Sequence, residues 1–437
     1  MKDLARQVFH EALAAVDINA ALEKNLARNG SQLQTAGRTI DLREFDSIVV
    51  IAFGKSALAM AEGFARILAP EYHPEGILVV PQAPARELSG WRAFIGGHPV
   101  PNAASFEAGR AILERLRGCD ERTLVFFLIS GGGSSLVEWP LNSQQSLADF
   151  QSLHAALVTC GASIEEINTV RKHLSATKGG RMAAAAPRSM KITFAISDVP
   201  RGAESALASG PTLPDPTTVR DAADVLRKFD LAAGLPLSLR SQEGSALFAE
   251  SPKAGDPAFA RGHFALLLSE HDLTDAAHRA CEAQGIRCVC DNATDNWPVE
   301  RAADYLLDLL SRLRRDQDFA SSSCPVAVLC SGELSSPVTG DGLGGRNSAF
   351  VLACVPKIAG KDIAVLSAGS DGIDGNSLAA GAVADGKTLA RAGALDLNPK
   401  DFQSRSDAYE FFSRLEDAVV TGPTGHNLRD LRILLAR

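Results

Sequence analysis

The sequence predicts an α/β protein with two domains, the first of them built on a doubly wound sheet. Apolar runs of strand length recur along the chain, and segments long enough for helices separate them. Such unbroken runs are typical of parallel strands that helices cover on both faces. The chain has 437 residues, whereas a single core usually stops growing near about 300 residues. We therefore expect two domains of the α/β class.

Five of these runs are the expected strands. They span residues 47–54, 123–130, 191–197, 326–332 and 362–369. In a doubly wound sheet, ligands bind beyond the carboxyl ends of the strands, so the residues that follow each run are the candidates for function. A stretch rich in Gly, Pro, Ser and Ala from about Leu235 to Gly262 indicates a linker or a boundary. The expected domains are residues 1–245 and 260–437.

Composition and charge favour a protein that acts on small molecules. The formal net charge is −8, and 46% of the residues are hydrophobic, which argues against nucleic acid and anionic membranes as partners. The N-terminal segment has no apolar signal region, and no later apolar run reaches about eighteen residues, so we expect a cytoplasmic protein. Eight scattered cysteines favour reduced thiols over a zinc site. The oligomeric state is left open, with a homodimer as one option.

A glycine-rich segment follows the run at 123–130. Gly131, Gly132 and Gly133 precede Ser134 and Ser135 at the expected start of a helix. Glycine lets backbone N–H groups converge on an anion, and a helix N-terminus adds a favourable dipole. The segment is not a P-loop, because no lysine follows the last glycine. A phosphate site and a tight strand-to-helix turn are equal alternatives here, and a phosphate site would need its cation from elsewhere.

Lys55 is the candidate for that cation. It follows the run at 47–54 and opens an expected helix. A positive charge at a helix N-terminus opposes the helix dipole, so its position makes more sense if an anion shares the site. A solvated lysine at a helix start is the alternative.

Acidic residues follow three further strands. An acid in such a position is often only a helix cap, so each one alone is weak support for a site. Together they match the needs of a Mg²⁺–phosphate complex, which takes one or two carboxylates besides phosphate oxygens and water. The acids are Asp198, Glu333, Asp371 and Asp374.

Two basic or glycine-rich segments add candidate anion ligands. The segment 168–181 carries Arg171, Lys172, His173, Lys178 and Arg181, although a helix that ends at Gly179 with basic residues in its last turn has ordinary capping chemistry. The loop 340–347 places Gly344 and Gly345 before Arg346 and Asn347, which suits a phosphate or a carboxylate. Two loops with Gly and Pro, 208–218 and 421–427, are expected walls of a ligand crevice.

The ordered motifs of the chain resemble those of the glycerate 2-kinases that combine an N-terminal Rossmann-like domain with a C-terminal MOFRL domain. The resemblance covers nearly the whole chain. It is carried by AFGKSA (52–57), GGHPVPN (96–102), LISGGGSSL (128–136), INTVRKHLSATKGGRMA (167–183), SDVPRG (197–202), ASGPTLPDPTT (208–218), SGE (331–333), GLGGRN (342–347), SAGSDGIDG (367–375), AGAV (380–383) and TGPTGHN (421–427).

The resemblance implies phosphoryl transfer from ATP to the 2-hydroxyl group of D-glycerate with Mg²⁺, in a cleft between a Rossmann-like domain and a smaller C-terminal domain. In such a mechanism Lys55 and Arg346 neutralise charge in the transition state, and Asp198 accepts the hydroxyl proton or holds the metal. Glu333 and Asp371 are alternative metal ligands. The two glycine-rich loops hold phosphates or the substrate carboxylate, and the residues that bind substrate are Arg171, Lys172, His173 and Lys178.

Two other functions remain as alternatives. Some relatives of this type carry the name hydroxypyruvate reductase, but this chain has no dinucleotide fingerprint with an acid about twenty residues further on. The second alternative is a non-catalytic protein that binds an anion or a nucleotide. Two residues depart from the family pattern, namely Ser370 in place of Thr and His426 in place of Thr or Ser. Neither change removes a lysine, an arginine or an acid, so we expect activity to be intact.

Overall fold

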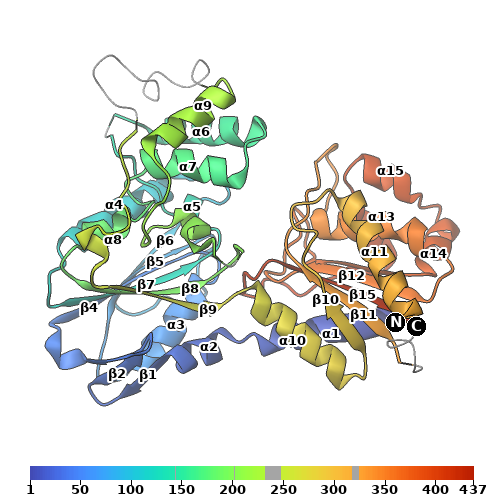
Figure 1. Cartoon of the computed structure of the whole chain (residues 1–437), viewed down its shortest axis with the longest axis horizontal. Helices are drawn as coiled ribbons and strands as arrows, with labels where there is room; N and C mark the ends of the chain where they lie inside the picture. The colour runs from blue at the N-terminus through green and yellow to red at the C-terminus, as the bar shows by residue number, and fades with distance from the viewer. Residues whose placement is uncertain (143, 201, 232–247, 317–323) are drawn as a thin grey trace. The chain divides into compact units, whose positions relative to one another are not determined.

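The computed structural model describes residues 1–142, 144–200, 202–231, 248–316 and 324–437 (Figure 1). These residues form two compact units. The larger one, Ile18–Leu267, is called the N-terminal unit here, and the other joins Met1–Asp17 to Leu268–Arg437 and is called the C-terminal unit. The first helix, α1 (Lys2–Ala15), belongs to the C-terminal unit, where it packs on α10 (Glu270–Ala283).

The N-terminal unit is built on a six-stranded sheet in the order β6-β5-β4-β7-β8-β9. Neighbouring strands from β6 to β8 are all parallel. Successive strands extend from β4 to one edge and then from β7 to the other, so β4 and β7 form the topological switch point. The expected doubly wound sheet is confirmed. Its strands are β4 (Ser47–Phe53), β5 (Glu75–Val80), β6 (Trp91–Ile95), β7 (Thr123–Ser130), β8 (Met190–Ile196) and β9 (Gly262–Leu268).

Helices cover both faces of this sheet. All eight residues of β7 are buried, and their side chains alternate between the faces. The ring centroid of Phe126 is 4.6 Å from that of Phe64 on α3 (Ala57–Leu68). Phe127 belongs instead to the core that includes Ile112 of α4 (Ala103–Arg117). Burial on both faces is the reason why β7 lacks any alternation of polar and apolar residues.

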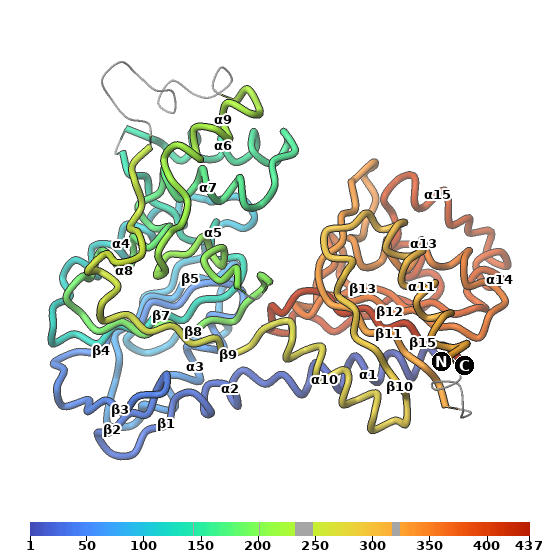
Figure 2. Tube along the Cα trace, viewed as in Figure 1, coloured from blue at the N-terminus to red at the C-terminus, as the bar shows by residue number. Residues whose placement is uncertain are grey.

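Two smaller parts complete the N-terminal unit. Three helices share an apolar core of their own: α6 (Leu147–Thr159), α7 (Ile164–Leu174) and α9 (Val219–Lys228). Figure 2 shows them apart from the strands of the sheet. A three-stranded antiparallel meander lies near the start of the unit. The remaining elements are α2 (Ile18–Asn25), β1 (Leu26–Asn29), β2 (Gln32–Thr35), β3 (Arg38–Asp41), η1 (Leu42–Glu44), α5 (Gly133–Leu136), α8 (Arg181–Ala185), η2 (Glu204–Ser209) and η4 (Pro257–Phe259).

The C-terminal unit has a mixed sheet in the order β10-β11-β15-β12-β13-β14. The expected parallel pairing of its strands is wrong at the centre, because the last strand, β15, lies antiparallel between β11 and β12. Since both neighbours are antiparallel to β15, they run in the same direction and their carboxyl ends lie at one edge. The elements are β10 (Arg287–Cys290), α11 (Val299–Arg315), β11 (Val326–Ser331), α13 (Arg346–Ile358), β12 (Ile363–Gly369), β13 (Gly381–Asp385), α14 (Thr388–Ala394), α15 (Pro399–Ser404), α16 (Ala408–Arg414), β14 (Ala418–Val419) and β15 (Asp430–Ala436).

The five expected strands are all present, each within one residue of its expected ends. Part of the expected linker, residues 232–247, lies outside the described residues. Beyond it Phe248 and Ser251 are buried in the N-terminal unit, so the stretch from 248 to 262 is not an open linker. The compact units therefore differ from the expected ranges 1–245 and 260–437, because α1 packs with the C-terminal unit and residues 248–267 pack with the N-terminal one.

Two expectations about the chain as a whole can be compared with the structure. Within the described ranges, no helix is both long enough and apolar enough to cross a membrane. All eight cysteines are free thiols, as expected, and four of them are buried.

Candidate active site

Two loops meet at the switch point of the N-terminal unit, one after β4 and one after β7. The backbone N–H of Lys55 donates to the carbonyl oxygen of Gly131 over 3.0 Å, and that of Ser56 donates to the hydroxyl of Ser130 over 2.9 Å. Gly54 has a φ of +122°, and a Cβ there would lie 2.5 Å from the carbonyl oxygen of Ser130, so only glycine permits this approach. The structure thus brings Lys55 and the glycine loop together.

The glycine loop, Gly131–Ser135, also lies against His98. Gly132 has a φ of +80°, and a Cβ on it would stand 3.3 Å from Cγ of Lys55 and 3.4 Å from Cε1 of His98. Nδ1 of His98 is 3.0 Å from the hydroxyl oxygen of Ser135. The helix expected after the loop, α5, has only four residues, so its dipole adds little to an anion site. Backbone amides and side-chain donors are what this loop offers to a ligand.

Sequence reasoning missed His98 and Ser209 as site residues. The hydroxyl of Ser209 is 2.7 Å from that of Ser134 and donates to Oδ1 of Asn168 over 2.9 Å. Ser209 belongs to the loop 208–218, which therefore contacts the glycine loop. Both missed residues lie in motifs of the family resemblance, GGHPVPN and ASGPTLPDPTT, and that was the signal that could have found them.

The structure buries three of the four basic residues that were expected to bind substrate. Lys178 is buried, with Nζ 2.9 Å from Glu138 and 2.8 Å from the carbonyl oxygen of Ser134. Burial lowers the pKa of Lys178, and Glu138 opposes that shift. Lys172 is buried 3.1 Å from Asp215. Both ammonium groups are thus engaged by buried carboxylates, which argues against the expected contact of these lysines with substrate.

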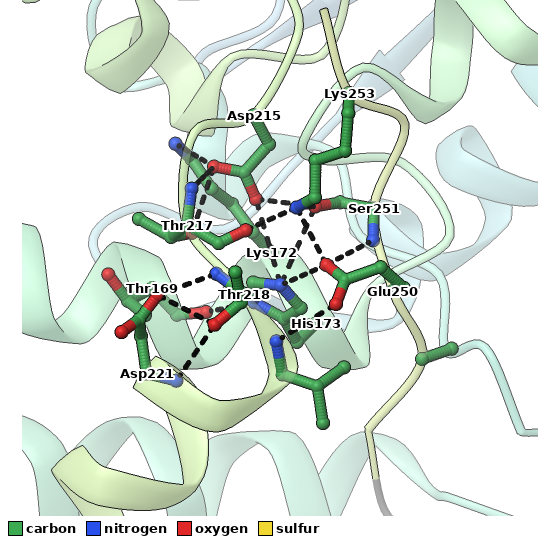
Figure 3. A network of polar contacts seen from close by, with 12 residues as sticks. Thr169, Lys172, His173, Asp215, Thr217, Thr218, Asp221, Glu250, Ser251 and Lys253 are labelled. Atoms are coloured by element: carbon green, nitrogen blue, oxygen red, sulfur yellow. Dashed lines mark hydrogen bonds and ion pairs between the residues drawn. The ribbon is translucent and has the colours of Figure 1, made fainter. Parts of the chain in front are cut away.

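The third of these residues, His173, is buried and belongs to a polar network that extends to exposed side chains (Figure 3). Its Nδ1 is 2.8 Å from the carbonyl oxygen of Thr169, and its Nε2 is 3.4 Å from Oε1 of Glu250. Ser251 donates to Asp215 over 2.8 Å, and Lys253 lies 2.6 Å from Glu250. The network holds residues 250–253 against α7 and the loop 208–218, so His173 has a structural position.

This network should make the fold sensitive to acid. Burial acts to raise the pKa of Glu250, but Lys253 and the backbone N–H of Val219 outweigh it and hold the pKa at about 2. A carboxylate with a depressed folded-state pKa contributes stability above its unfolded pKa, about 4.3, and loses it as the pH falls towards the folded value. We expect the difference in melting temperature between wild type and Glu250→Gln to shrink between about pH 5 and pH 3.

The measurement is thermal unfolding followed by circular dichroism across that range. Glu410→Gln is the matched control, since Glu410 forms a surface ion pair with Arg414 on one helix and such pairs contribute little. Parallel curves for wild type and Glu250→Gln would show that the network does not contribute to acid sensitivity.

Arg171 is placed differently from its three neighbours. Its guanidinium contacts Nδ1 of His154 on α6, and burial lowers its pKa while Glu138 opposes the shift. A small cavity beside it includes Ser134 and Ser135 of the glycine loop in its lining. Of the four basic residues that were expected to bind substrate, Arg171 is the one in this lining.

In the C-terminal unit Arg346 is held by two acids. Its Nε and Nη2 donate to the two carboxylate oxygens of Asp430 over 2.5 and 3.3 Å, and its Nη2 lies 2.8 Å from Glu333. Burial acts to lower the pKa of Arg346, but Asp430 and Glu333 outweigh it and raise the pKa. Glu333 is therefore a counter-ion of Arg346. Asp430, the first residue of β15, was not predicted from the sequence as a site residue. Its position three residues after the TGPTGHN motif could have indicated it.

The loop before α13 uses its backbone amides within the protein. The N–H groups of Gly345 and Asn347 donate to Asp374 over 3.1 and 3.0 Å, and that of Gly344 donates to Asn376 over 2.9 Å. Burial raises the pKa of Asp374, and hydrogen bonds from the start of α13 oppose that shift. Asp374 thus occupies the position expected for a phosphate, which corrects the expectation that these amides bind one.

The expected metal ligands lie in both units. Asp371 follows β12. A Cβ on Gly369 would lie 3.1 Å from Oδ1 of Asp371 and 3.5 Å from Oδ1 of Asp430, so both carboxylates lie beside Gly369. Asp198 follows β8 in the N-terminal unit. Across the described part of the chain, no group of three or more His, Cys, Asp or Glu side chains is placed to hold a metal ion. Mg²⁺ that arrives on nucleotide phosphates needs only one or two carboxylates, and Asp371 or Asp198 fits that requirement.

Both units thus present charged and hydroxyl side chains beyond the carboxyl ends of strands, the position at which α/β proteins bind small ligands. A family model described as a domain of unknown function (DUF4147) matches residues 4–242, and the MOFRL family model matches residues 326–430. The chain belongs to the glycerate 2-kinase family.

Individual relatives match the chain over nearly its whole length. D-glycerate 2-kinase of Thermotoga maritima is 30% identical over 99% of this chain and 98% of its own length. A protein of Agrobacterium vitis with a provisional hydroxypyruvate reductase name is 33% identical over 99% of this chain and 94% of its own. The crystal structure of a glycerate kinase from Thermotoga maritima superposes with a TM-score of 0.82 at 29% identity, covering 100% of this chain and 99% of that one.

Proposed function

We propose that this protein transfers the γ-phosphoryl group of ATP to the 2-hydroxyl group of D-glycerate, giving 2-phospho-D-glycerate. The observation that carries the proposal is the meeting of Lys55, His98 and the glycine loop at the switch point of a doubly wound sheet, which is where such folds bind ligands. Relatives named glycerate kinase support an enzyme of this kind.

In this proposal the N-terminal unit binds and orients the reacting groups. Phosphoryl transfer needs in-line positioning and neutralisation of charge on the transferred oxygens, with little covalent chemistry from the protein. The backbone amides of Gly131–Ser135 and the ammonium group of Lys55 bind the phosphoryl oxygens. Asp198, beyond the next strand, accepts the proton of the 2-hydroxyl group or takes part in holding the metal.

Mg²⁺, when bound with the nucleotide, would neutralise phosphate charge, and Asp371 or Asp198 are the residues that would hold it. In the C-terminal unit Arg346 supplies a fixed guanidinium whose direction is set by Asp430. That Arg346 and Lys55 act on one and the same phosphoryl group stays a prediction, as does the expected cleft between the domains.

The proposal is tested by measuring ADP release from Mg²⁺–ATP in the presence and absence of D-glycerate. We expect ADP to form in proportion to D-glycerate consumed. ADP formation that is independent of D-glycerate would contradict the assigned acceptor.

The reductase name of some relatives is tested with the same preparation. NADPH or NADH with hydroxypyruvate should show no loss of absorbance at 340 nm, because the chain lacks a dinucleotide fingerprint and the amides before α13 donate to Asp374 and Asn376. Oxidation of the cofactor would favour the reductase.

A further inference from the structure

Arg429 is a buried arginine that joins three distant segments of the C-terminal unit. Its Nη1 donates to Oε2 of Glu270, at the start of α10, over 2.9 Å. Its Nη2 donates to Oδ1 of Asp295, in the segment between β10 and α11, over 2.6 Å. Burial acts to lower the pKa of Arg429, but Asp295 and Glu270 outweigh it and raise the pKa. The guanidinium therefore stays charged between the two acids.

The backbone of Arg429 is held in an uncommon conformation. Its φ is +65°, a value that few residues other than glycine adopt and that persists only where the surroundings fix it. Its carbonyl oxygen accepts from the N–H of Ser370 over 2.9 Å, and the N–H of Leu428 donates to the hydroxyl of Ser370 over 2.7 Å. The ion pairs of the side chain and these backbone contacts together fix the point at which the chain enters β15.

This point determines the position of the first acid that holds Arg346. The residue after Arg429 is Asp430, and its carboxylate accepts both hydrogen bonds from Arg346. A change of the backbone angles at one residue rotates the next side chain along the strand. The direction of the Asp430 carboxylate therefore depends on the conformation of Arg429.

The second acid that holds Arg346 is linked to Arg429 through Asp295. Oδ1 of Asp295 accepts from Nη2 of Arg429 and also from the backbone N–H of Glu333, over 2.9 Å. Glu333 in turn lies 2.8 Å from Arg346. The neighbouring Gly332 has a φ of +105°, and a Cβ there would lie 2.9 Å from Oδ1 of Asp295, so glycine permits this approach. One guanidinium thus fixes the segments that carry both acids.

We propose that Arg429 is a positioning residue for phosphoryl transfer, because it fixes Asp430 and Glu333, which set the direction of Arg346. A guanidinium stabilises the transition state only where its N–H groups point at the transferred oxygens. The proposal rests on the proposed function for the role of Arg346. Arg429 acts through Arg346 and contacts no reactant.

The first test is ADP release by Arg429→Gln at saturating ATP and D-glycerate. We expect kcat to fall by about 10-fold to 10²-fold, because a displacement of about 1 Å can cost 10²-fold even when the changed residue is remote from the chemistry. KM for D-glycerate should stay within a few-fold of wild type, since the affected contact belongs to the transition state. A wild-type kcat would overturn the proposal.

Arg391→Gln is the matched control. Arg391 pairs with another buried acid of the same unit, Asp417, over 2.7 Å. The control should lower the melting temperature and keep wild-type kcat, and equal losses of kcat in both variants would overturn the proposal. If Arg429→Gln does not fold, Glu270→Gln replaces it, because this change removes one anchor and leaves Arg429 paired with Asp295. Its kcat should also lie below wild type, and an unchanged value would contradict the proposal.

A double variant tests whether Arg429 acts through Arg346. Arg346→Ala removes the group that Arg429 is proposed to position. Adding Arg429→Gln to Arg346→Ala should therefore lower kcat no further, since residues that act through one group are not additive. A further loss as large as the one that Arg429→Gln causes in wild type would overturn the proposal.

A measurement without turnover separates this proposal from the proposed function. In protein with ¹⁵N-labelled arginine, the Nε–H of Arg346 that donates to Asp430 gives a resonance that is identified by its absence from Arg346→Ala. Arg429→Gln should shift or broaden this resonance, and Arg391→Gln should leave it unchanged. If it responds in this way but D-glycerate is not phosphorylated, the proposed function fails and the positioning of Arg346 by Arg429 stands. If it does not respond to Arg429→Gln, the positioning role is excluded.

Discussion

Replacing Lys55 with methionine should lower kcat by about 10²-fold to 10⁵-fold, the range found when one electrostatic contact to a reacting group is lost. Methionine keeps the length and the apolar stem of the side chain but removes the charge beside Gly132. The loop contact from the backbone N–H of residue 55 to Gly131 does not depend on the side chain. We therefore expect the melting temperature to change little.

The measurement is ADP release at saturating ATP and D-glycerate, with Lys24→Met as the control because Lys24 is exposed. The control should keep wild-type kcat. A Lys55→Met protein with kcat within a few-fold of wild type would remove Lys55 from the mechanism.

Replacing Arg346 with alanine should also lower kcat by about 10²-fold to 10⁵-fold, by analogy with other arginines that stabilise phosphoryl transfer. Unlike the change at Lys55, it should also destabilise the fold, because the buried carboxylate of Asp430 loses the partner that donates to both of its oxygens. An unsatisfied buried polar group costs about 1–3 kcal/mol.

A double variant separates the two effects. In Arg346→Ala with Asp430→Asn, the uncompensated charge is gone, so the melting temperature should recover while kcat stays low. Thermal unfolding and ADP release are measured on both proteins. Recovery of kcat together with stability would show that Arg346 acts only through folding.

The strand ends of the N-terminal unit could be predicted from the sequence because the relevant signals are local. Unbroken apolar runs marked β4 and β7, and parallel strands that neighbour each other place their following residues at one edge. Lys55 and the glycine loop could therefore be expected near each other before any contact was known. The length of the helix after the loop could not be predicted from these local signals, and α5 has only four residues.

The partners of the charged residues could not be predicted, because each pair joins segments far apart in the chain. Asp430 reaches Arg346 only because β15 lies antiparallel between β11 and β12. Asp374 appeared to be one acid of a metal site, yet it caps α13. Lys178 has the charge expected of a residue that binds an anionic ligand, but its ammonium group forms an ion pair with Glu138. Sequence pattern marks residues with suitable chemistry, whereas tertiary contacts determine which of them remain able to bind a ligand.

The most direct test of the central claim is ³¹P NMR of the product formed from ATP, Mg²⁺ and D-glycerate. Phosphate on the 2-oxygen is coupled to the single proton of C2, so the account predicts a new resonance that is a doublet in the proton-coupled spectrum. Phosphate on the 3-oxygen is coupled to the two protons of C3, and a triplet would therefore contradict the assignment of the 2-hydroxyl group as the acceptor.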